Sequence, residues 1–181
     1  MKKLYLITGP SGVGKTTVAH KLLDLGLPLK RLVTYTTRTP RPNEVNGVDY
    51  NFVSNDEFKR KIADNEFFEY AEVYGNFYGN SRKDLDNLWD EGLDALMVLD
   101  IQGVKTIEKI IPEAKSIFIK PDTFENLRNR ILQRPMSDEA FQKRWATVES
   151  EMAEAHECDC MITNEEGKLE EAVEAIKKII S

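Results

Sequence analysis

The sequence contains only two cysteines, Cys158 and Cys160, which stand two positions apart. Small extracellular proteins that depend on disulfides have more cysteines at wider spacing, so this class is excluded and reduced thiols are expected. The sequence also lacks an apolar run near the roughly 20 residues of a membrane-spanning helix, and the apolar residues after Met1 are too few for a signal peptide. We therefore expect a cytoplasmic protein without a membrane partner.

An excess of positive charge is also absent, because 25 lysines and arginines stand against 31 aspartates and glutamates. The formal net charge of −6 argues against nucleic acid as a partner, since nucleic-acid binding favours a basic surface. No internal repeat or low-complexity linker interrupts the sequence. A chain of 181 residues with 41% hydrophobic and 31% charged residues is typical of one globular domain.

What the sequence does contain is a glycine-rich stretch at residues 9–16 that reads G-P-S-G-V-G-K-T. It fits the pattern G-x-x-x-x-G-K-[ST], in which backbone N–H groups of a loop and of the following helix surround phosphate groups. The apolar run 4–7 predicts a buried strand before the loop, and the spacing of apolar residues over 17–23 predicts a helix after it. A chance glycine turn is the alternative, but it does not account for both flanking elements.

This pattern predicts a nucleoside triphosphate site. Lys15 is expected to reach the β- and γ-phosphates, and the Thr16 hydroxyl is expected to ligate Mg²⁺. The residues predicted to contact the triphosphate, ATP in a kinase, are Gly9, Pro10, Ser11, Gly12, Val13, Gly14, Lys15, Thr16 and Thr17. The loop alone leaves hydrolase, motor and kinase as open alternatives.

The rest of the chain alternates between short apolar runs and helical patterns. Apolar runs at 95–100 and 116–119 predict buried strands, and 161–163 predicts a last strand. Helices are expected at 104–111, from Asp122 or Thr123 through Gln133, from a polar break at 134–138 to about His156, and at 169–180. The alternation predicts an α/β fold of the P-loop NTPase type, with a parallel sheet core flanked by helices.

The middle of the chain departs from this alternation and reads as a small mixed α/β insertion. The expected elements there are a strand at 31–35, a loop at 36–48, a strand at 50–53, a hairpin of 67–73 and 77–78, and helices opened by capping boxes at Ser54 and Ser81. The expected parts are a core of residues 1–33, 93–122 and 157–181, an insertion at 34–92 and a helical lid at 123–156.

A second informative stretch, residues 34–44, holds Arg38 and Arg41 three positions apart between prolines. The planar guanidinium group binds phosphate in a bidentate manner, so this pair suits a dianionic phosphate. A solvated basic loop is the simpler alternative. It weakens beside a triphosphate loop, because a phosphoryl acceptor requires a second phosphate site.

Residues 36–52 read T-T-R-T-P-R-P-N-E-V-N-G-V-D-Y-N-F, and this stretch resembles the guanylate kinase family. The similarity continues through 68–71, 78–79 and 100–103 and covers nearly the whole chain. The resemblance implies phosphoryl transfer from ATP to GMP with Mg²⁺, in purine nucleotide metabolism, with small nucleotides as partners and a monomer or homodimer as the assembly. It also implies that the insertion binds GMP.

The resemblance implies roles for particular residues. The implied GMP-binding residues are Thr34, Arg38, Arg41, Glu44, Tyr50, Glu69, Tyr78, Asn80 and Asp100. Arg38, Arg41, Tyr50 and Tyr78 would hold the GMP phosphate. Glu69 would accept hydrogen bonds from guanine N1–H and the 2-amino group, a donor pair that adenine lacks. The simpler alternatives are an exposed strand carboxylate at Glu69 and a helix-capping acid at Asp100.

The resemblance also assigns Lys15 and the lid arginines Arg130, Arg134 and Arg144 to catalysis, because positive groups neutralise the charge of a transferring phosphoryl group. The departures from the family pattern are Asn43 for a glycine, Asn80 for a serine or threonine, Val98 for an acid, Pro135-Met136 for Gly-Thr, and a lid that is one residue shorter.

Two other functions stay open at this point. One is a non-catalytic guanylate-kinase-like binding module, which Val98 favours and the intact loop disfavours. The other is a related kinase with a different acceptor, such as a phosphorylated sugar. A metal cluster at His156, Cys158 and Cys160 lacks a fourth ligand nearby, so we expect buried structural cysteines there.

Overall fold

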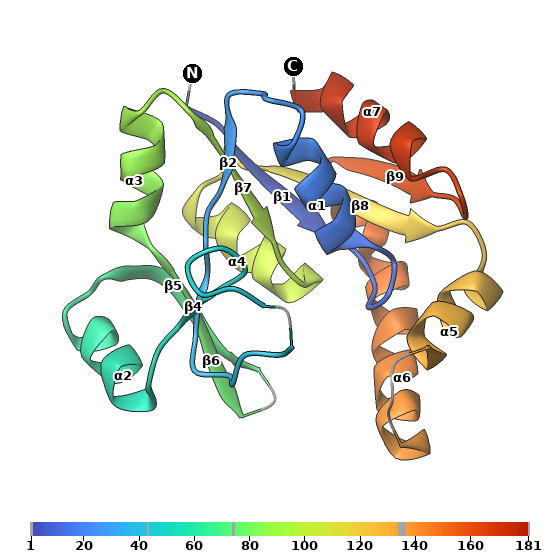
Figure 1. The fold of residues 1–181 in the computed structure, drawn as a ribbon, viewed down its shortest axis with the longest axis horizontal. Coiled ribbons are helices and arrows are strands. Elements are labelled where there is room, and N and C mark those ends of the chain that lie inside the picture. Colours follow the sequence, from blue (N-terminus) through green and yellow to red (C-terminus); the bar gives the residue numbers. More distant parts are fainter. Residues whose placement is uncertain (1, 43, 74, 134–136, 181) are drawn as a thin grey trace. The chain divides into compact units, whose positions relative to one another are not determined.

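The computed structural model describes residues 2–42, 44–73, 75–133 and 137–180. The chain divides into two compact units, one formed by residues 1–2 and 28–97 and the other by residues 3–27 and 98–181. Figure 1 colours the chain from its N-terminus to its C-terminus.

The second unit is built on three parallel strands. These are β1 (Leu4–Thr8), β8 (Lys115–Pro121) and β9 (Cys160–Asn164). β8 pairs with both of the others, and Ile117 lies opposite Ile7 of β1 and Cys160 of β9. Every residue of β1 is buried. Residues 116–119 of β8 are buried too, as predicted, whereas β9 at the edge of the sheet is partly exposed.

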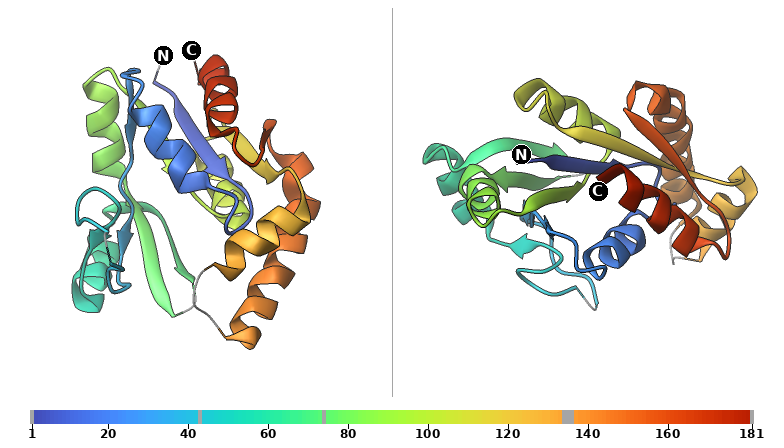
Figure 2. Two further views of the ribbon diagram at one scale, coloured as in Figure 1. Left: turned by 45° about the vertical axis from the view of Figure 1, so that its right-hand side comes forward. Right: turned by 90° about the horizontal axis from the view of Figure 1, so that it is seen from above.

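Helices cover both faces of these three strands. They are α1 (Lys15–Leu23), α4 (Ile101–Ile110), α5 (Phe124–Leu132), α6 (Asp138–Glu154), the 3₁₀ turn η1 (Ala155–Glu157) and α7 (Leu169–Ile180). In the right-hand view of Figure 2, α1 and α7 lie on one side of the strands, and α4 and α6 lie on the other. None of the described helices is long and apolar enough to cross a membrane.

The first unit holds a mixed sheet and one parallel strand pair. The mixed sheet has the order β4 (Asn51–Phe52), β3 (Tyr35–Thr36), β6 (Asn76–Ser81) and β5 (Phe67–Val73). β2 (Leu29–Arg31) pairs in parallel with β7 (Asp94–Val98). Five parallel strands and flanking helices confirm the α/β fold class.

The helices of the first unit begin where their capping residues predict. Ser54 accepts a hydrogen bond from the backbone of Glu57 at 3.1 Å and opens α2 (Asn55–Ala63). Ser81 accepts one from Asp84 at 3.2 Å and opens α3 (Arg82–Asp90). α2 packs on the mixed sheet through Phe58, whose ring centre lies 4.7 Å from that of Phe67.

One expected strand is wrong. Residues 31–35 were predicted to form one strand, but β2 ends at Arg31 and β3 begins at Tyr35, in different sheets. The reason is a change of hydrogen-bond partner, because Leu32 N–H donates to Leu96 at 2.9 Å, whereas the carbonyl of Thr34 accepts from Asn51 at 2.9 Å. Boundaries also differ elsewhere, since β7 ends at Val98 and α6 at Glu154.

Candidate functional site

The glycine-rich loop connects β1 to α1, as its motif requires. Gly9 has a φ of +136°, and a Cβ atom there would lie 2.1 Å from the carbonyl oxygen of Ile119. Gly14 has a φ of +100°, and a Cβ atom there would lie 2.7 Å from the side-chain nitrogen of Asn164. That nitrogen donates to the carbonyl of Val13 at 2.7 Å. The loop conformation thus depends on glycine at both positions.

The first turn of α1 is available to an anion. Gly14 is the N-cap residue, no side chain caps the helix, and the first turn contains no acidic residue. The N–H groups at the start of a helix have no partner within the helix and carry partial positive charge. Thr16 and Thr17 are exposed in this turn. The arrangement can therefore bind phosphate groups by backbone donors.

Lys15 lies across the loop that precedes it. Its ammonium group donates to the carbonyl oxygen of Gly9 and, at 3.2 Å, to that of Pro10. Both acceptors belong to the loop that a triphosphate would occupy. The structure therefore brings the predicted lysine to the predicted phosphate site.

The predicted lid arginines have different partners. Arg144 of α6 donates from Nη1 to the Oγ of Ser11 in the loop at 3.0 Å. Arg130 of α5 forms an ion pair with Glu166, with Nε 2.9 Å from the carboxylate. Arg134 lies outside the described residues, as do Asn43, Pro135 and Met136. Of the described lid arginines, Arg144 contacts the loop and Arg130 pairs with Glu166.

Asp100 caps a helix, which is the simpler of the two roles weighed for it. Its Oδ1 accepts a hydrogen bond from the backbone of Gly103 at 2.7 Å at the start of α4. Asp100 belongs to the unit that holds the glycine-rich loop, whereas the other residues predicted to bind GMP belong to the first unit. A capping carboxylate uses one oxygen for the helix and retains lone pairs on the other for a ligand.

Glu151 is a residue that the sequence analysis missed. It is only 7% exposed, and its Oε2 has no hydrogen-bond partner among the residues that the structure describes. Burial raises the pKa of this carboxyl to about 7, and the charges of Asp100 and Glu154 add to the rise, while Lys15 opposes it. Its spacing of seven residues from Arg144, which places both on the same face of a helix, could have identified Glu151 from the sequence.

The arginine stretch of the first unit forms a charged cluster. The Nη2 of Arg38 donates to both oxygens of Glu44, at 2.8 and 2.9 Å, and the backbone N–H of Arg41 donates to the same carboxylate at 2.8 Å. Burial opposes ionisation of Glu44, but the hydrogen bonds from Arg38 and Arg41 hold its pKa below the usual value. The side chain of Arg41 is exposed. Glu44 therefore holds the stretch in a fixed conformation.

Two tyrosines predicted to bind phosphate are grouped with Arg38. The ring centres of Tyr50 and Tyr78 lie 6.1 Å apart in an edge-on contact, and the guanidinium of Arg38 lies 5.2 Å from the ring centre of Tyr50. Burial raises the pKa of Tyr50, so this phenol remains a hydrogen-bond donor at neutral pH. The structure thus brings Arg38, Tyr50 and Tyr78 together.

Arg31 is a further basic residue beside this cluster that the sequence analysis did not assign to a site. Its guanidinium lies 5.8 Å from the ring centre of Tyr50, and its side chain is 11% exposed. The Oδ1 of Asp49 lies 4.0 Å from the Nη1 of Arg31. Within the described part of the chain, that nitrogen makes no hydrogen bond. The predicted strand at 31–35 placed Arg31 at the start of a strand, whereas β2 ends at this residue.

A third group of predicted residues forms a hydrogen-bonded chain. Glu69 of β5 lies opposite Asn80 of β6. The Asn80 amide nitrogen donates to the Glu69 carboxylate at 2.9 Å, and its amide oxygen accepts from the Thr34 hydroxyl at 2.9 Å. Asn80 and Thr34 are 1% and 9% exposed. The asparagine that departs from the family pattern therefore links the two neighbours expected to bind a base.

The cysteines agree in part with expectation. Cys158 and Cys160 are free and half-buried, rather than fully buried as predicted. Burial raises the pKa of the Cys158 thiol to about 11, so it stays protonated at neutral pH. The described residues contain no group of three His, Cys, Asp or Glu side chains placed to hold a metal ion.

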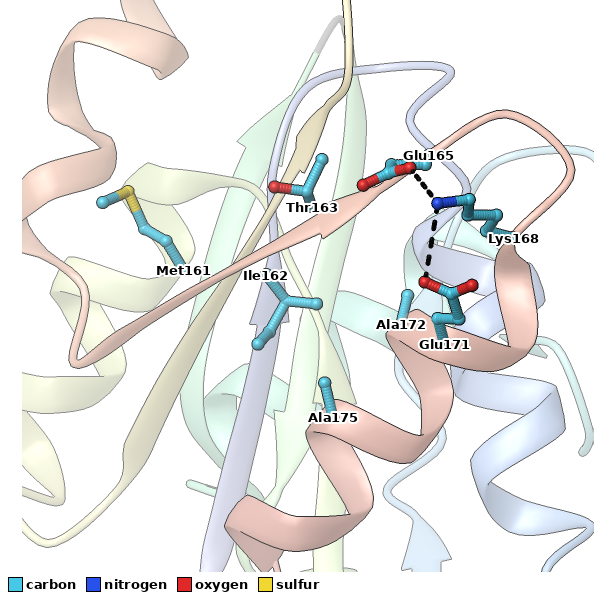
Figure 3. A pocket seen from close by; sticks show the side chains of 8 residues that line it. All are labelled: Met161, Ile162, Thr163, Glu165, Lys168, Glu171, Ala172 and Ala175. Carbon is cyan, nitrogen blue, oxygen red and sulfur yellow. Dashed lines mark ion pairs between the residues drawn. The ribbon is translucent and has the colours of Figure 1, made fainter.

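A hollow of about 210 Å³ beside β9 and α7 contains none of the predicted site residues. Figure 3 shows Lys168 between Glu165 and Glu171, with its Nζ 2.8 Å and 3.8 Å from their carboxylates. The rest of the lining consists of Met161, Ile162, Thr163, Ala172 and Ala175. This hollow lies between α7 and the edge strand β9, and no residue of the glycine-rich loop lines it.

Comparison with known proteins decides the family. The family model described as guanylate kinase matches residues 1–181, the whole chain. The chain belongs to the guanylate kinase family. A guanylate kinase of Nitrosospira multiformis is 40% identical over 178 residues, which cover 98% of this chain and 84% of the relative. A guanylate kinase of Geobacter sulfurreducens is 42% identical over 178 residues, covering 98% and 87%.

A solved structure agrees with this membership. The crystal structure of guanylate kinase from Anaplasma phagocytophilum matches with a TM-score of 0.79 at 33% sequence identity. The match covers 99% of this chain and 84% of that chain. The family resemblance drawn from residues 36–52 is therefore confirmed, and so is the fold that it implied.

Proposed function

We propose that this guanylate kinase family member transfers the γ-phosphoryl group of ATP to GMP, forming ADP and GDP within purine nucleotide metabolism. The observation that carries the proposal is the presence of two different phosphate-binding sets in one chain. One is the loop and helix start at Gly14 and Lys15, and the other is the cluster of Arg38, Tyr50 and Tyr78. A transferase between two nucleotides needs both.

The donor half takes the triphosphate of ATP. Backbone N–H groups of the loop and of α1 surround the phosphates, and Lys15 leaves the carbonyls of Gly9 and Pro10 to bind the β- and γ-phosphates. Mg²⁺ bound here supplies charge neutralisation between the phosphates. The exposed Thr16 hydroxyl in the first turn of α1 would ligate it, since Mg²⁺ prefers oxygen ligands.

The acceptor half takes GMP. Arg38 and Arg41 provide guanidinium groups for its phosphate, and Tyr50 and Tyr78 provide phenol donors. Glu44 keeps Arg38 in place through two hydrogen bonds of 2.8 and 2.9 Å. A phosphate arriving here meets donors that are already oriented, so little side-chain order has to be created on binding.

Guanine is distinguished from adenine by the chain of Thr34, Asn80 and Glu69. The Glu69 carboxylate has capacity for more than the one bond from Asn80, and guanine offers it two adjacent donors. The second N–H of the Asn80 amide can donate to the guanine oxygen. Adenine would leave the carboxylate without donors, and sites built on such hydrogen bonds reject the wrong ligand strongly.

Transfer itself needs no protein base, because the attacking group is already a phosphate anion. Catalysis then consists of positioning the two phosphates and stabilising the charge that spreads over the transferred group. Lys15 and the lid arginines Arg130, Arg134 and Arg144 supply that positive charge. Arg144 already contacts the loop at Ser11, so it stands in reach of the triphosphate. The free thiols fit a cytoplasmic enzyme.

A coupled assay with ATP, Mg²⁺ and one nucleoside monophosphate at a time tests the proposal. We expect GDP formation with GMP and at least about 10³-fold lower kcat/KM with AMP, because a hydrogen-bonding site rejects a ligand without the matching donors. Equal rates with AMP and GMP would contradict the proposed base recognition. Absence of transfer with every monophosphate would instead indicate a binding module.

A further inference from the structure

We propose that Glu151 is a further positioning residue of the donor half, whose carboxylate accepts hydrogen bonds from the water shell of the Mg²⁺ that accompanies ATP. This inference rests on the proposed function and adds a residue to it. Glu151 lies on α6, the same helix that carries Arg144 to the glycine-rich loop.

The first support is the face of α6 that Glu151 shares. Arg144, Val148, Glu151 and Ala155 follow one another at intervals of four, three and four residues, which places them along one side of a helix. Arg144 bonds the loop at Ser11, Val148 is fully buried, and Ala155 at the end of the helix packs against Ile101, the first residue of α4. Glu151 is therefore held between the loop and the start of α4.

The second support is the unsatisfied carboxylate. Glu151 is 93% buried, as its 7% exposure implies, and its Oε2 receives no hydrogen bond from any described residue. A buried carboxylate oxygen without a donor is costly, so one is expected only where a ligand or ordered water completes it. The neighbouring α6 acid, Glu154, has such partners in Gln102 and Lys105, at 3.1 Å and 2.6 Å.

The third support is the set of charges that act on Glu151. They are Lys15 from the loop and α1, Asp100 at the start of α4, and Glu154 from its own helix. Glu151 thus lies within electrostatic range of the lysine that binds phosphate and of a second carboxylate, Asp100. Mg²⁺ in nucleotide sites keeps several waters and uses one or two carboxylates together with the phosphates, which matches this donor set.

A small set of oxygen donors suits Mg²⁺ better than Ca²⁺ or Zn²⁺. Ca²⁺ takes six to eight oxygen ligands at longer distances, and a structural Zn²⁺ site uses cysteine or histidine ligands. Here Thr16 and two carboxylates leave most positions to water and phosphate. Glu151 can act through those waters, as residues behind the metal ligands do.

The test compares the affinity of ATP with and without Mg²⁺ by isothermal titration calorimetry, using EDTA for the metal-free arm. Wild type should bind the magnesium complex more tightly than metal-free ATP. In Glu151→Gln, this advantage should fall by about tenfold or more, because loss of an outer-shell partner costs about 10- to 100-fold in metal affinity. Metal-free ATP should bind as well as before or better, since a negative charge has been removed.

The matched control is Glu149→Gln, which removes the same charge from an exposed position of α6. It should leave the magnesium advantage unchanged. If Glu151→Gln also leaves it unchanged, or weakens both forms of ATP equally, the inference is wrong. If the glutamine variant does not fold, Glu151→Asp decides in the same way, because withdrawing the carboxylate by one methylene should reduce the advantage several-fold.

The same experiment distinguishes failure of the proposed ATP site from failure of the role proposed for Glu151. A wild-type protein that binds neither form of ATP contradicts the donor site itself. A wild-type protein that binds the magnesium complex, paired with a Glu151→Gln variant that does so equally well, contradicts only the role of Glu151.

Discussion

The proposed donor half and acceptor half differ in which part of the chain forms them, backbone in one and side chains in the other. The donor half consists mainly of backbone, in which Gly9 and Gly14 adopt positive φ values and the first turn of α1 has no side-chain cap. The acceptor half consists of side chains from several strands and one loop, and its charges are already paired, as in Arg38 with Glu44.

This difference predicts which substitutions should weaken binding at each half. A backbone site depends first on glycine conformation and on the free N–H groups of a helix start, and Lys15 and a few other side chains complete it. A side-chain site depends on each member of a network, because removing one partner leaves the others buried and unsatisfied. Substitutions should therefore have separable effects on ATP and on GMP.

The largest effect is expected at Lys15. Lys15→Met removes the positive charge that reaches the transferring phosphoryl group, and we expect kcat to fall by about 10²- to 10³-fold, as for loss of one transition-state donor. GMP affinity should be unchanged. Lys21→Met is the control, because Lys21 is exposed on the same helix and pairs with Glu170 at 2.8 Å. A coupled kinetic assay compares them, and a Lys15 variant as active as the control would contradict the role.

The next effect is expected at Glu69. Glu69→Gln replaces an acceptor of two donors with an amide, and we expect GMP to bind about 10- to 100-fold more weakly, the size of one or two hydrogen bonds to a charged group. Affinity for ATP should stay the same. Glu72→Gln on the same strand is the control, because Glu72 is exposed. Unchanged GMP affinity in Glu69→Gln would remove the basis for base recognition.

A smaller effect, on stability, is expected at Gly14. In Gly14→Ala, a positive φ of +100° combines with a Cβ only 2.7 Å from the Asn164 amide, so we expect a loss of about 2–3 kcal/mol in the free energy of unfolding. Gly26→Ala is the control, since its φ is +68° and nothing lies within 4 Å. It should lose only about 1 kcal/mol. Urea denaturation measures the free energy of unfolding of both variants. Equal losses would show that the Asn164 side chain moves away from the new Cβ at no cost.

The smallest effect concerns pH and the acceptor half. Folding lowers the pKa of Glu44, so its ionised form contributes stability above the ordinary value of 4.5 and loses it as pH falls through the lower folded value. The stability difference between wild type and Glu44→Gln should therefore be constant near pH 7 and shrink below about pH 4.5. A difference that is independent of pH down to about pH 2 would contradict the pairing with Arg38.

The same contrast explains how much the sequence could predict. The donor loop is contiguous, so residues 9–16 and their flanking elements predict its conformation without other knowledge. The acceptor half joins Thr34, Glu69 and Asn80 across three segments, and only the family resemblance brought them together before the structure did. Local capping at Ser54 and Ser81 was predictable for the same reason as the loop.

What escaped prediction depends on contacts between distant segments. The split of residues 31–35 into β2 and β3 follows from a change of partner strand, from β7 to β4, which no local pattern records. Arg31 was overlooked with it. Glu151 shows helical spacing from Arg144, but its burial and its unsatisfied oxygen appear only once α6 is packed.

A crossed binding experiment decides whether the two halves are separate. Dissociation constants for GMP and for ATP with Mg²⁺ would be measured by calorimetry for wild type, Lys15→Met and Glu69→Gln. We expect Lys15→Met to weaken ATP alone and Glu69→Gln to weaken GMP alone, by about tenfold or more in each case. If either variant weakened both nucleotides equally, the division into a backbone-built donor half and a side-chain-built acceptor half would be contradicted.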